Sequence, residues 1–293
     1  MDRTKIFAGL IATVTIACML CGCTRARHLT VSSKNFSEQL ILGEIAAQHL
    51  ENRLHQKITR KLDLGGTLLA HQAIVKGEID LYPEYTGTAL TAILKQPPSS
   101  DGAEVLAKVR SGYREWNLEW MEPLGFDNTF AMVVRREDAD ARNTKTLSDA
   151  SEYRPGWRLG VGYEFVKRPD GLAGLLTTYG LNVKGSVKTM DLGLLYQALQ
   201  QKQVDMVAGN ATDGLLSVLP VSVLADDKHY FPPYQAAFIV RSQALKDYPG
   251  LREALHELEG KFSTEAMRKL NHELDGRHRP LREIAREFLG SLR

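Results

Sequence analysis

The sequence is poor in cysteine, and the few that it has are confined to one end. They are Cys18, Cys21 and Cys23, so the chain beyond Cys23 contains no thiol. That stretch can form no disulfide bond and offers no cysteine ligand to a metal ion. A domain without disulfides depends on its hydrophobic core, and about 265 residues are enough to build one.

An excess of charge of one sign is also missing. The chain has 37 Lys and Arg against 35 Asp and Glu, a formal net charge of +2. So balanced a chain does not favour nucleic acid as a partner. Near the C-terminus, basic residues alternate with Glu283 and Glu287, which is typical of a solvated amphipathic helix. Hydrophobic residues at 43% and charged residues at 25% indicate a globular protein.

Motifs of common enzymes are absent. The sequence contains no Gly-x-Ser-x-Gly, His-Glu-x-x-His, Walker loop or Gly-x-Gly-x-x-Gly. Its eight histidines are scattered, and none pairs at the spacing of metal ligands on a helix. We therefore expect neither catalysis, nor a cofactor, nor a metal site.

One apolar run stands at the N-terminus. Arg3 and Lys5 precede an uncharged stretch, Ile6–Leu20, which at about 15 residues is too short to cross a bilayer comfortably and suits a signal peptide. It ends in Leu20–Cys23, which resembles the lipobox of bacterial lipoproteins. The resemblance implies removal of residues 1–22 and acylation of Cys23, so we expect an exported, lipid-anchored protein of the periplasm or cell surface. A signal peptide cleaved elsewhere and a retained anchor are the alternatives.

Beyond the leader, strand and helix patterns alternate. Phe130–Val134 reads as a further apolar strand, and Asp138–Ser151 as a polar loop. Strands separated by helices predict βαβ crossovers and a mainly parallel sheet. The first predicted elements are a strand at Leu29–Ser33, a helix at Ser37–Leu54 capped by Ser37, a strand at Ile58–Leu64, a helix at Thr67–Lys76, a strand at Ile79–Tyr82 and a helix at Thr86–Leu94.

The same plan begins again near Trp157. The segment His71–Asp80 matches Tyr196–Asp205 at an offset of 125 residues, although chance similarity between two βα units is an alternative. Two similar α/β lobes are predicted, with a ligand cleft between them and hinge closure around the ligand. The offset places Asn210 in the position of Tyr85, so both residues should line the cleft.

Four motifs then identify a family. The motifs are Ser33–Gln39, Tyr82–Thr88, Ala211–Gly214 and Phe231–Tyr234. They are similar to segments of the substrate-binding proteins of glycine betaine/choline/proline betaine (osmoprotectant) ABC transporters, and the resemblance runs from about Leu29 to the C-terminus. It implies a type II periplasmic-binding fold, an α/β class with lobe I at 28–130 plus 235–293 and lobe II at 131–234. It also implies a monomer that captures a quaternary-ammonium osmolyte and delivers it to an ABC permease.

A trimethylammonium group has charge but no hydrogen-bond donor, so aromatic faces bind it, each contributing about 0.5–2 kcal/mol when desolvated. A carboxylate at the other end needs Lys, Arg or hydroxyl donors. The resemblance implies aromatic-cage positions at Tyr85, Phe130 and Tyr234, anion-binding positions at Lys34, Thr88 and Arg168, a weaker cleft candidate at Asn128, and Asn210 where better-known betaine binders have a further cage aromatic.

Each candidate also has a structural alternative. Tyr82 and Tyr85 could both pack on the core, although we favour Tyr85 for the cleft. Phe130 could be a core residue, Tyr234 a packing residue of the hinge and Arg168 a solvated surface residue. We expect Asp213 to be a helix N-cap rather than a ligand contact.

The solute is the most open part of the prediction. Asn210 removes one aromatic face and adds a polar group, so either betaine affinity is weakened or the ligand is a bulkier betaine, such as an ergothioneine-like solute or carnitine. A ligand-sensing protein without a transport role is a second alternative, because the same fold serves as an effector module.

Overall fold

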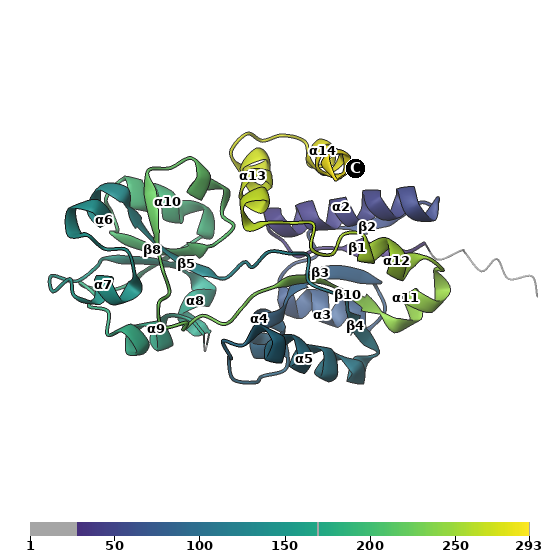
Figure 1. The fold of residues 1–293 in the computed structure, drawn as a ribbon, viewed down its shortest axis with the longest axis horizontal. Coiled ribbons are helices and arrows are strands. Elements are labelled where there is room, and N and C mark those ends of the chain that lie inside the picture. The colour runs from purple at the N-terminus through teal and green to yellow at the C-terminus, as the bar shows by residue number, and fades with distance from the viewer. Residues whose placement is uncertain (1–27, 169, 293) are drawn as a thin grey trace, which may run out of the picture.

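The computed structural model describes residues 28–168 and 170–292. The predicted signal peptide and the lipid-anchor position Cys23 lie outside the described residues. The chain forms two α/β lobes side by side (Figure 1). Each lobe contains a five-stranded sheet, with the orders β2-β1-β3-β10-β4 and β7-β6-β8-β5-β9. No helix in the described ranges has both the length and the apolar character needed to cross a membrane.

Lobe I is built from two separate parts of the chain. Its strands β1, β2 and β3 pair in parallel, whereas β10 pairs antiparallel with β3 and with β4. Ser37 is the first residue of its helix and makes no cap, so the predicted capping role is wrong. The elements are β1 (Thr30–Ser32), α2 (Ser37–Leu54), β2 (Thr59–Lys61), α3 (Thr67–Val75), β3 (Leu81–Tyr85), α4 (Thr86–Thr88), a π-helix η1 (Ala89–Ile93), α5 (Gly102–Tyr113), a 3-10 helix η2 (Arg114–Trp116), β4 (Leu118–Trp120), β10 (Ala236–Arg241), α11 (Ser242–Asp247), α12 (Leu251–His256), α13 (Thr264–Asp275) and α14 (Leu281–Ser291).

Lobe II is a single stretch of chain. The predicted loop at 138–151 is wrong, because most of it is helical. Thr146 forms a capping box with Asp149, and Arg142 pairs with Asp138 one turn away, which stabilises two short helices. The elements are β5 (Phe130–Arg135), α6 (Arg136–Arg142), α7 (Leu147–Ser151), β6 (Leu159–Gly162), α8 (Tyr163–Lys167), α9 (Leu172–Tyr179), β7 (Lys188–Met190), α10 (Leu192–Gln200), β8 (Met206–Asn210), a 3-10 helix η3 (Gly214–Ser217) and β9 (Val221–Leu224).

The two lobes repeat one another down to single side chains. Strands β3 and β8 occupy the same place in their sheets, and their bounds differ by the predicted offset. Just before them, Asp80 accepts a hydrogen bond from the backbone of Thr30, and Asp205 accepts one from the backbone of Arg158. An arginine at the end of the antiparallel strand pairs with each aspartate, Arg241 with Asp80 at 2.9 Å and Arg135 with Asp205 at 2.8 Å.

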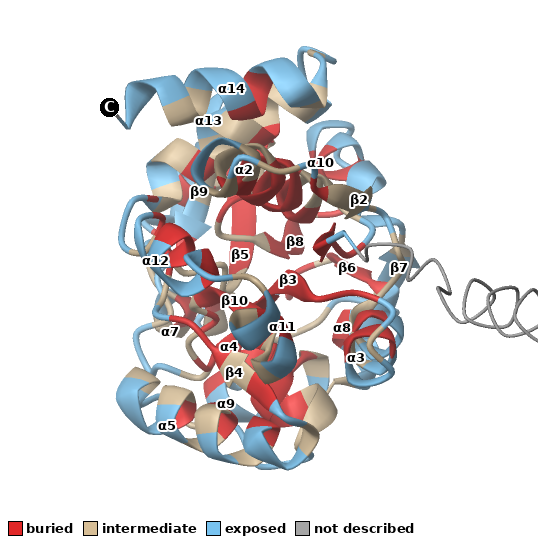
Figure 2. Cartoon of the chain, turned by 90° about the vertical axis from the view of Figure 1, so that its right-hand side faces the viewer, coloured by how far each residue is buried: buried red, intermediate tan, exposed pale blue. Residues whose placement is uncertain are grey.

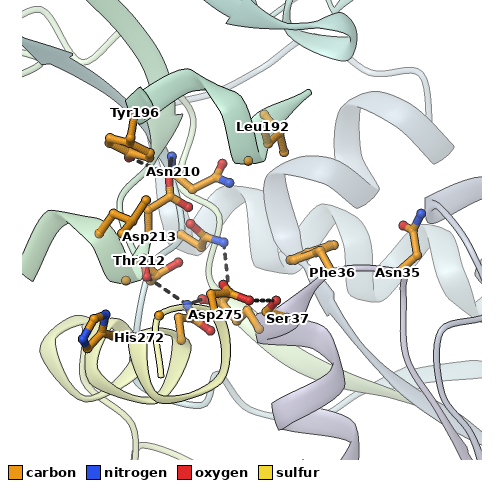
Figure 3. A pocket seen from close by; sticks show the side chains of 17 residues that line it. Asn35, Phe36, Ser37, Leu192, Tyr196, Asn210, Thr212, Asp213, His272 and Asp275 are labelled. Carbon is orange, nitrogen blue, oxygen red and sulfur yellow. Dashed lines mark hydrogen bonds between the residues drawn. The ribbon is translucent and has the colours of Figure 1, made fainter. Parts of the chain in front are cut away.

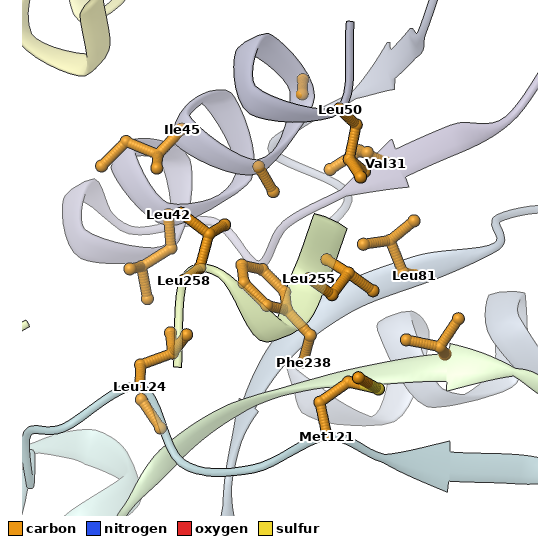
Figure 4. Packing of buried hydrophobic residues seen from close by; sticks show 14 of the residues in the cluster. Val31, Leu42, Ile45, Leu50, Leu81, Met121, Leu124, Phe238, Leu255 and Leu258 are labelled. Atoms are coloured by element: carbon orange, nitrogen blue, oxygen red, sulfur yellow. The ribbon is translucent and has the colours of Figure 1, made fainter. Parts of the chain in front are cut away.

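Hydrophobic residues cover both faces of both sheets. In β10, Phe238 packs on one face while Ala237 and Ile239 pack on the other, the period of two expected of a strand. Figure 4 shows α2 laid over the first face, with Leu42 directed toward Leu258, and Ile45 belongs to the same buried cluster. Buried residues run through both sheets, whereas the outer helix faces are exposed (Figure 2). Both lobes therefore present rigid strand ends to the space between them.

Two crossing segments, 121–129 and 225–235, join the lobes. They lie together, because Asp127 and Gln235 form an antiparallel bridge and the Asn128 amide donates to the Tyr234 carbonyl at 3.1 Å. A third contact comes from α13, seen between the lobes in Figure 1, whose Arg268 donates to the Ala211 carbonyl at 2.7 Å. Paired crossovers of this kind form a hinge.

Candidate functional site

A cavity of about 580 Å³ lies between the lobes, where β3 and β8 end. Both lobes contribute to its wall, as the repeat predicts for a cleft at strand carboxyl ends. All of the side chains that the sequence singled out as ligand-binding candidates line this one cavity. They are Lys34, Tyr85, Thr88, Asn128, Phe130, Arg168, Asn210 and Tyr234.

On the lobe I side, the wall is aromatic. Tyr85 ends β3, and its ring lies 6.3 Å from that of Phe36, nearly parallel to it. The Lys34 ammonium lies 4.7 Å from the centre of the Tyr85 ring and 5.6 Å from that of Phe36. Tyr82 is buried in the core on the opposite face of the sheet, so the preference for Tyr85 over Tyr82 agrees with the geometry. The faces of the Tyr85 and Phe36 rings therefore already lie close to one cation, the Lys34 ammonium.

Lys34 is buried against Glu84, which is fully buried. Its ammonium donates to Glu84 at 2.5 Å and to the Thr67 hydroxyl at 3.3 Å. Glu84 also accepts a hydrogen bond from the backbone amide of Tyr85 at 2.8 Å. The pair has no net charge, so Lys34 serves the cavity as an oriented donor rather than as an unpaired positive charge.

The lobe II side has a second aromatic group. The rings of Phe130 and Tyr234 are 5.8 Å apart, and the Arg168 guanidinium lies 5.4 Å and 5.6 Å from their centres. Phe130 also packs edge-on against Phe165 at 4.8 Å, so it belongs to both the core and the cavity wall. Arg168 is therefore not the solvated surface residue that the sequence left open.

A buried carboxylate fixes the position of Arg168. Asp170 is fully buried and accepts from the Nε and Nη2 atoms of Arg168 at 2.9 and 2.7 Å. Tyr234 hydrogen-bonds to both members of this pair. The Arg168 Nη1 group has no hydrogen-bond partner among the described residues, and the same holds for the Thr88 hydroxyl. Both groups are available to an anionic group in the cavity.

Glu38 lies behind the cavity, where the lobes meet. It accepts hydrogen bonds from the Tyr85 hydroxyl at 2.6 Å, from Asn128 at 2.9 Å and from Asn271 at 3.1 Å. Burial raises the pKa of its carboxyl, and hydrogen bonds, among them those from Tyr85 and Asn271, oppose that shift in pKa. Glu38 therefore ties the aromatic wall to the hinge and to helix α13.

Glu38→Gln is expected to remove a pH-dependent loss of stability. With the pKa raised above its usual 4.5, the folded protein keeps this proton to higher pH than the unfolded chain. The stabilisation is complete below the unfolded pKa and is lost as pH rises through the folded pKa. Denaturation of both proteins from about pH 4.5 to 8 should show the free energy of unfolding shifting in favour of the glutamine variant as the pH rises. A difference that does not change with pH would contradict this, and the exposed Glu115→Gln is the control substitution.

Asn210 ends β8 opposite Phe130, with which it is paired in the sheet. Its backbone amide donates to Asp213 at 2.8 Å, and the Tyr196 hydroxyl donates to the same carboxylate at 2.6 Å. Asp213 stands at the N-cap position of η3, as expected, although its side chain makes no cap hydrogen bond there. Its carboxylate points back to the strand end and holds the turn on which Asn210 stands.

Several residues of the site were not among the candidates. Phe36 and Glu84 lie within motifs that carried the family resemblance, so their positions were signalled although their roles were not. Asp170 stands two residues after Arg168, a spacing that could have suggested the pair. Asn271 had no local signal, because α13 reaches the site only through the tertiary fold.

Two α/β lobes, joined by paired crossovers and separated by a cavity with aromatic walls, define a solute-binding protein of the two-lobe type. The family model for the substrate binding domain of ABC-type glycine betaine transport systems matches residues 27–291. The chain belongs to this family, whose members are substrate-binding proteins of transporters and are not enzymes.

Relatives of known ligand are about one-third identical to the chain. The carnitine transport binding protein OpuCC of Listeria monocytogenes is 34% identical over 86% of this chain and 83% of its own length. The glycine-betaine-binding protein of Pseudomonas aeruginosa is 32% identical over 96% and 94%. The ergothioneine transport permease/ergothioneine binding protein EgtU of Helicobacter pylori is 34% identical over 91% of this chain. The chain spans about half of that relative, 48% of its length.

Solved structures confirm the fold. A glycine betaine/carnitine/choline ABC transporter structure superposes with a TM-score of 0.81 at 31% identity, over 90% of this chain and 98% of the other. The lactococcal OpuAC in its closed, glycine betaine-bound conformation superposes with a TM-score of 0.62 at 13% identity, over 90% and 96%. The type II periplasmic-binding fold expected from the resemblance is thus confirmed.

Proposed function

We propose that this protein is an extracytoplasmic, lipid-anchored solute-binding protein that captures a betaine-type solute between its lobes and delivers it, as a monomer, to an ABC permease. The observation that carries the proposal is the cavity. Aromatic rings from both lobes line it, and each aromatic pair already lies within about 6 Å of a cation, the range of cation–π attraction.

The cavity suits a ligand that has a cation without hydrogen donors at one end. A trimethylammonium group would be held by the faces of Tyr85, Tyr234 and Phe130, to which Phe36 is added. A carboxylate would bind the unpartnered Nη1 group of Arg168, the Thr88 hydroxyl and the remaining donor of Lys34. Because the two basic residues are already neutralised by Asp170 and Glu84, a zwitterion fits better than a simple anion.

The preferred solute is a bulkier betaine rather than plain glycine betaine. Asn210 supplies an amide at the end of β8 where one more ring face would complete the cage. Relatives of comparable similarity are named for carnitine, glycine betaine and ergothioneine, so family membership alone does not select among them. The polar position at Asn210 favours a solute with an additional polar group.

Isothermal titration with glycine betaine, choline, carnitine and ergothioneine tests the proposal. We expect at least one of them to bind, with glycine betaine weaker than a bulkier betaine. Sub-micromolar binding of glycine betaine would refute the preference, and binding of none would refute the function. A thermal-shift screen gives the same ranking, since a ligand at 100 times its dissociation constant adds about 2.7 kcal/mol of stability.

Tyr85→Ala is expected to weaken binding of the best solute by at least about 1 kcal/mol, because one cation–π face is lost. Tyr85→Phe keeps the ring and loses only the hydroxyl that donates to Glu38, so it should retain more affinity. Tyr82→Phe, in the core on the other face of the sheet, is the matched control with unchanged affinity. Titration of the three variants with that solute measures the contribution of the Tyr85 ring to binding. Unchanged affinity in Tyr85→Ala would remove this residue from the cage.

A further inference from the structure

A second cavity, of about 490 Å³, adjoins the first. We call it the annex. It lies between the N-terminus of α2, helix α13 and the turn that follows β8, and Figure 3 shows side chains of both lobes directed into it. Asn128, Asn210, Phe36 and Leu192 line both cavities, so the two meet at these side chains. A ligand seated among the aromatic rings could therefore extend into the annex past Asn210.

The wall of the annex is rich in hydrogen-bond acceptors. Glu38, Asp213 and Asp275 supply carboxyl groups, and within the described part of the chain no lysine or arginine lines it. Asp213 is held by Tyr196, and Asp275 accepts a hydrogen bond from the Ser37 hydroxyl at the rim. Such a wall complements a group that presents N–H or O–H donors.

Two amide oxygens of residues in this wall are buried and have no hydrogen-bond partner in the described part of the chain. Asn271 is only 5% exposed, and its Nδ2 donates to Glu38 at 3.1 Å and to the Thr212 carbonyl at 2.8 Å. Because both of those partners are acceptors, the orientation of the amide is fixed, and its Oδ1 has no hydrogen-bond partner among the described residues. Asn128 is fixed in the same way by Glu38, and its Oδ1 is also unpartnered.

Buried acceptors without donors are unfavourable, and a ligand that supplies the donors removes that cost. Plain glycine betaine has no N–H or O–H group to offer them. We propose that the annex is a second subsite, which takes the donor-bearing side arm of a betaine, such as an N–H-containing heterocycle, while the trimethylammonium group binds among the aromatic rings. This inference rests on the proposed function and specifies the ligand class for the same site.

Two ring-bearing betaines test the subsite directly. N,N,N-trimethylhistidine carries an N–H donor on its ring, and N,N,N-trimethylphenylalanine has a ring of similar shape without one. The wild-type protein should bind the histidine compound at least about tenfold more tightly, because a site of buried polar groups discriminates against a partner that leaves them unpaired. Titration with glycine betaine measures the binding of the trimethylammonium and carboxylate groups that the two ring compounds share.

Two variants separate the annex from the aromatic site. Gly193 lines the annex, and a side chain built there meets nothing within 4 Å, so Gly193→Leu should fill the annex without disturbing the fold. Asn271→Leu removes one unpartnered acceptor. Both changes should reduce the preference for trimethylhistidine toward unity, and Gly193→Leu should leave glycine betaine affinity within about twofold.

The outcomes distinguish the two proposals. Equal affinity of the two ring compounds in the wild-type protein, or a preference that survives Gly193→Leu, overturns the subsite while betaine binding stands. Failure of all three compounds, and also of choline, carnitine and ergothioneine, to bind overturns the proposed function together with the subsite. A preference of about tenfold that is lost in Gly193→Leu supports both.

Discussion

Asp80→Ala is expected to lower the free energy of unfolding by about 3–5 kcal/mol, the range found when one member of a buried ion pair is removed. The Asp80 side chain is 2% exposed and accepts hydrogen bonds from Arg241 and from the backbone amide of Thr30, both at 2.9 Å. Its loss leaves the Arg241 guanidinium and a strand amide without their partner. Urea denaturation of the variant beside the wild-type protein measures the effect.

The internal repeat provides a matched comparison. Asp205 has the corresponding contacts in lobe II and also accepts from the Arg158 guanidinium at 2.7 and 2.5 Å. Its side chain is 18% exposed, so Asp205→Ala should nevertheless cost less than Asp80→Ala. Although burial acts to raise the pKa of Asp205, hydrogen bonds from Arg158 and Arg135 hold it well below the usual 3.8. The stabilisation from this group is therefore complete above about pH 4 and is lost as the pH falls below that value. Equal effects of the two substitutions would contradict the dependence on burial, and no effect of either would contradict a structural role.

The repeat explains why so much of the fold could be predicted. The match of His71–Asp80 with Tyr196–Asp205 placed β3 and β8 at the same point in two sheets, and the structure gives them bounds that differ by the same offset. Local sequence patterns did not predict the secondary structure where short-range side-chain contacts determine it. The helices within 138–151 depend on a capping box and a one-turn ion pair that the polar composition concealed. Their small apolar content gives no periodic signal.

The positions that line the site could be predicted from the sequence, but the ion pairs and hydrogen bonds that connect them could not. Tyr85, Phe130, Arg168 and Tyr234 line one cavity as expected. The buried carboxylates behind them were not foreseen, because a sequence does not show which acid neutralises which base after folding. Asp170 neutralises Arg168, and Glu84 neutralises Lys34. The cavity therefore offers oriented hydrogen-bond donors in place of net positive charge.

Lys34→Met is expected to destabilise the protein by about 3–5 kcal/mol, because it leaves the carboxylate of Glu84 buried without its cation. The side chains are 5% and 0% exposed, and Glu84 would keep only the hydrogen bond from the Tyr85 amide. Glu84→Gln on its own leaves Lys34 charged and unpaired in the same place. Each single substitution should therefore be costly.

The double variant separates the cost of the unpaired charge from the value of the pair. Lys34→Met with Glu84→Gln removes both charges, so its destabilisation should be much smaller than the sum of the two single effects. A double-mutant cycle in urea gives the coupling energy between the two sites. Additive effects would show that the 2.5 Å contact contributes no specific stabilisation.

Ligand binding should respond differently from stability. The double variant has no donor at position 34, so it should fold and yet bind the betaine carboxylate more weakly. If its affinity equals that of the wild-type protein, Lys34 acts only to neutralise Glu84, and Arg168 with Thr88 would hold the anionic end alone. If affinity falls while the fold is retained, the same ammonium both balances a buried acid and orients the solute. Its position 4.7 Å from the Tyr85 ring favours the second outcome, because it brings the anion-binding donor next to the ring proposed to hold the cation.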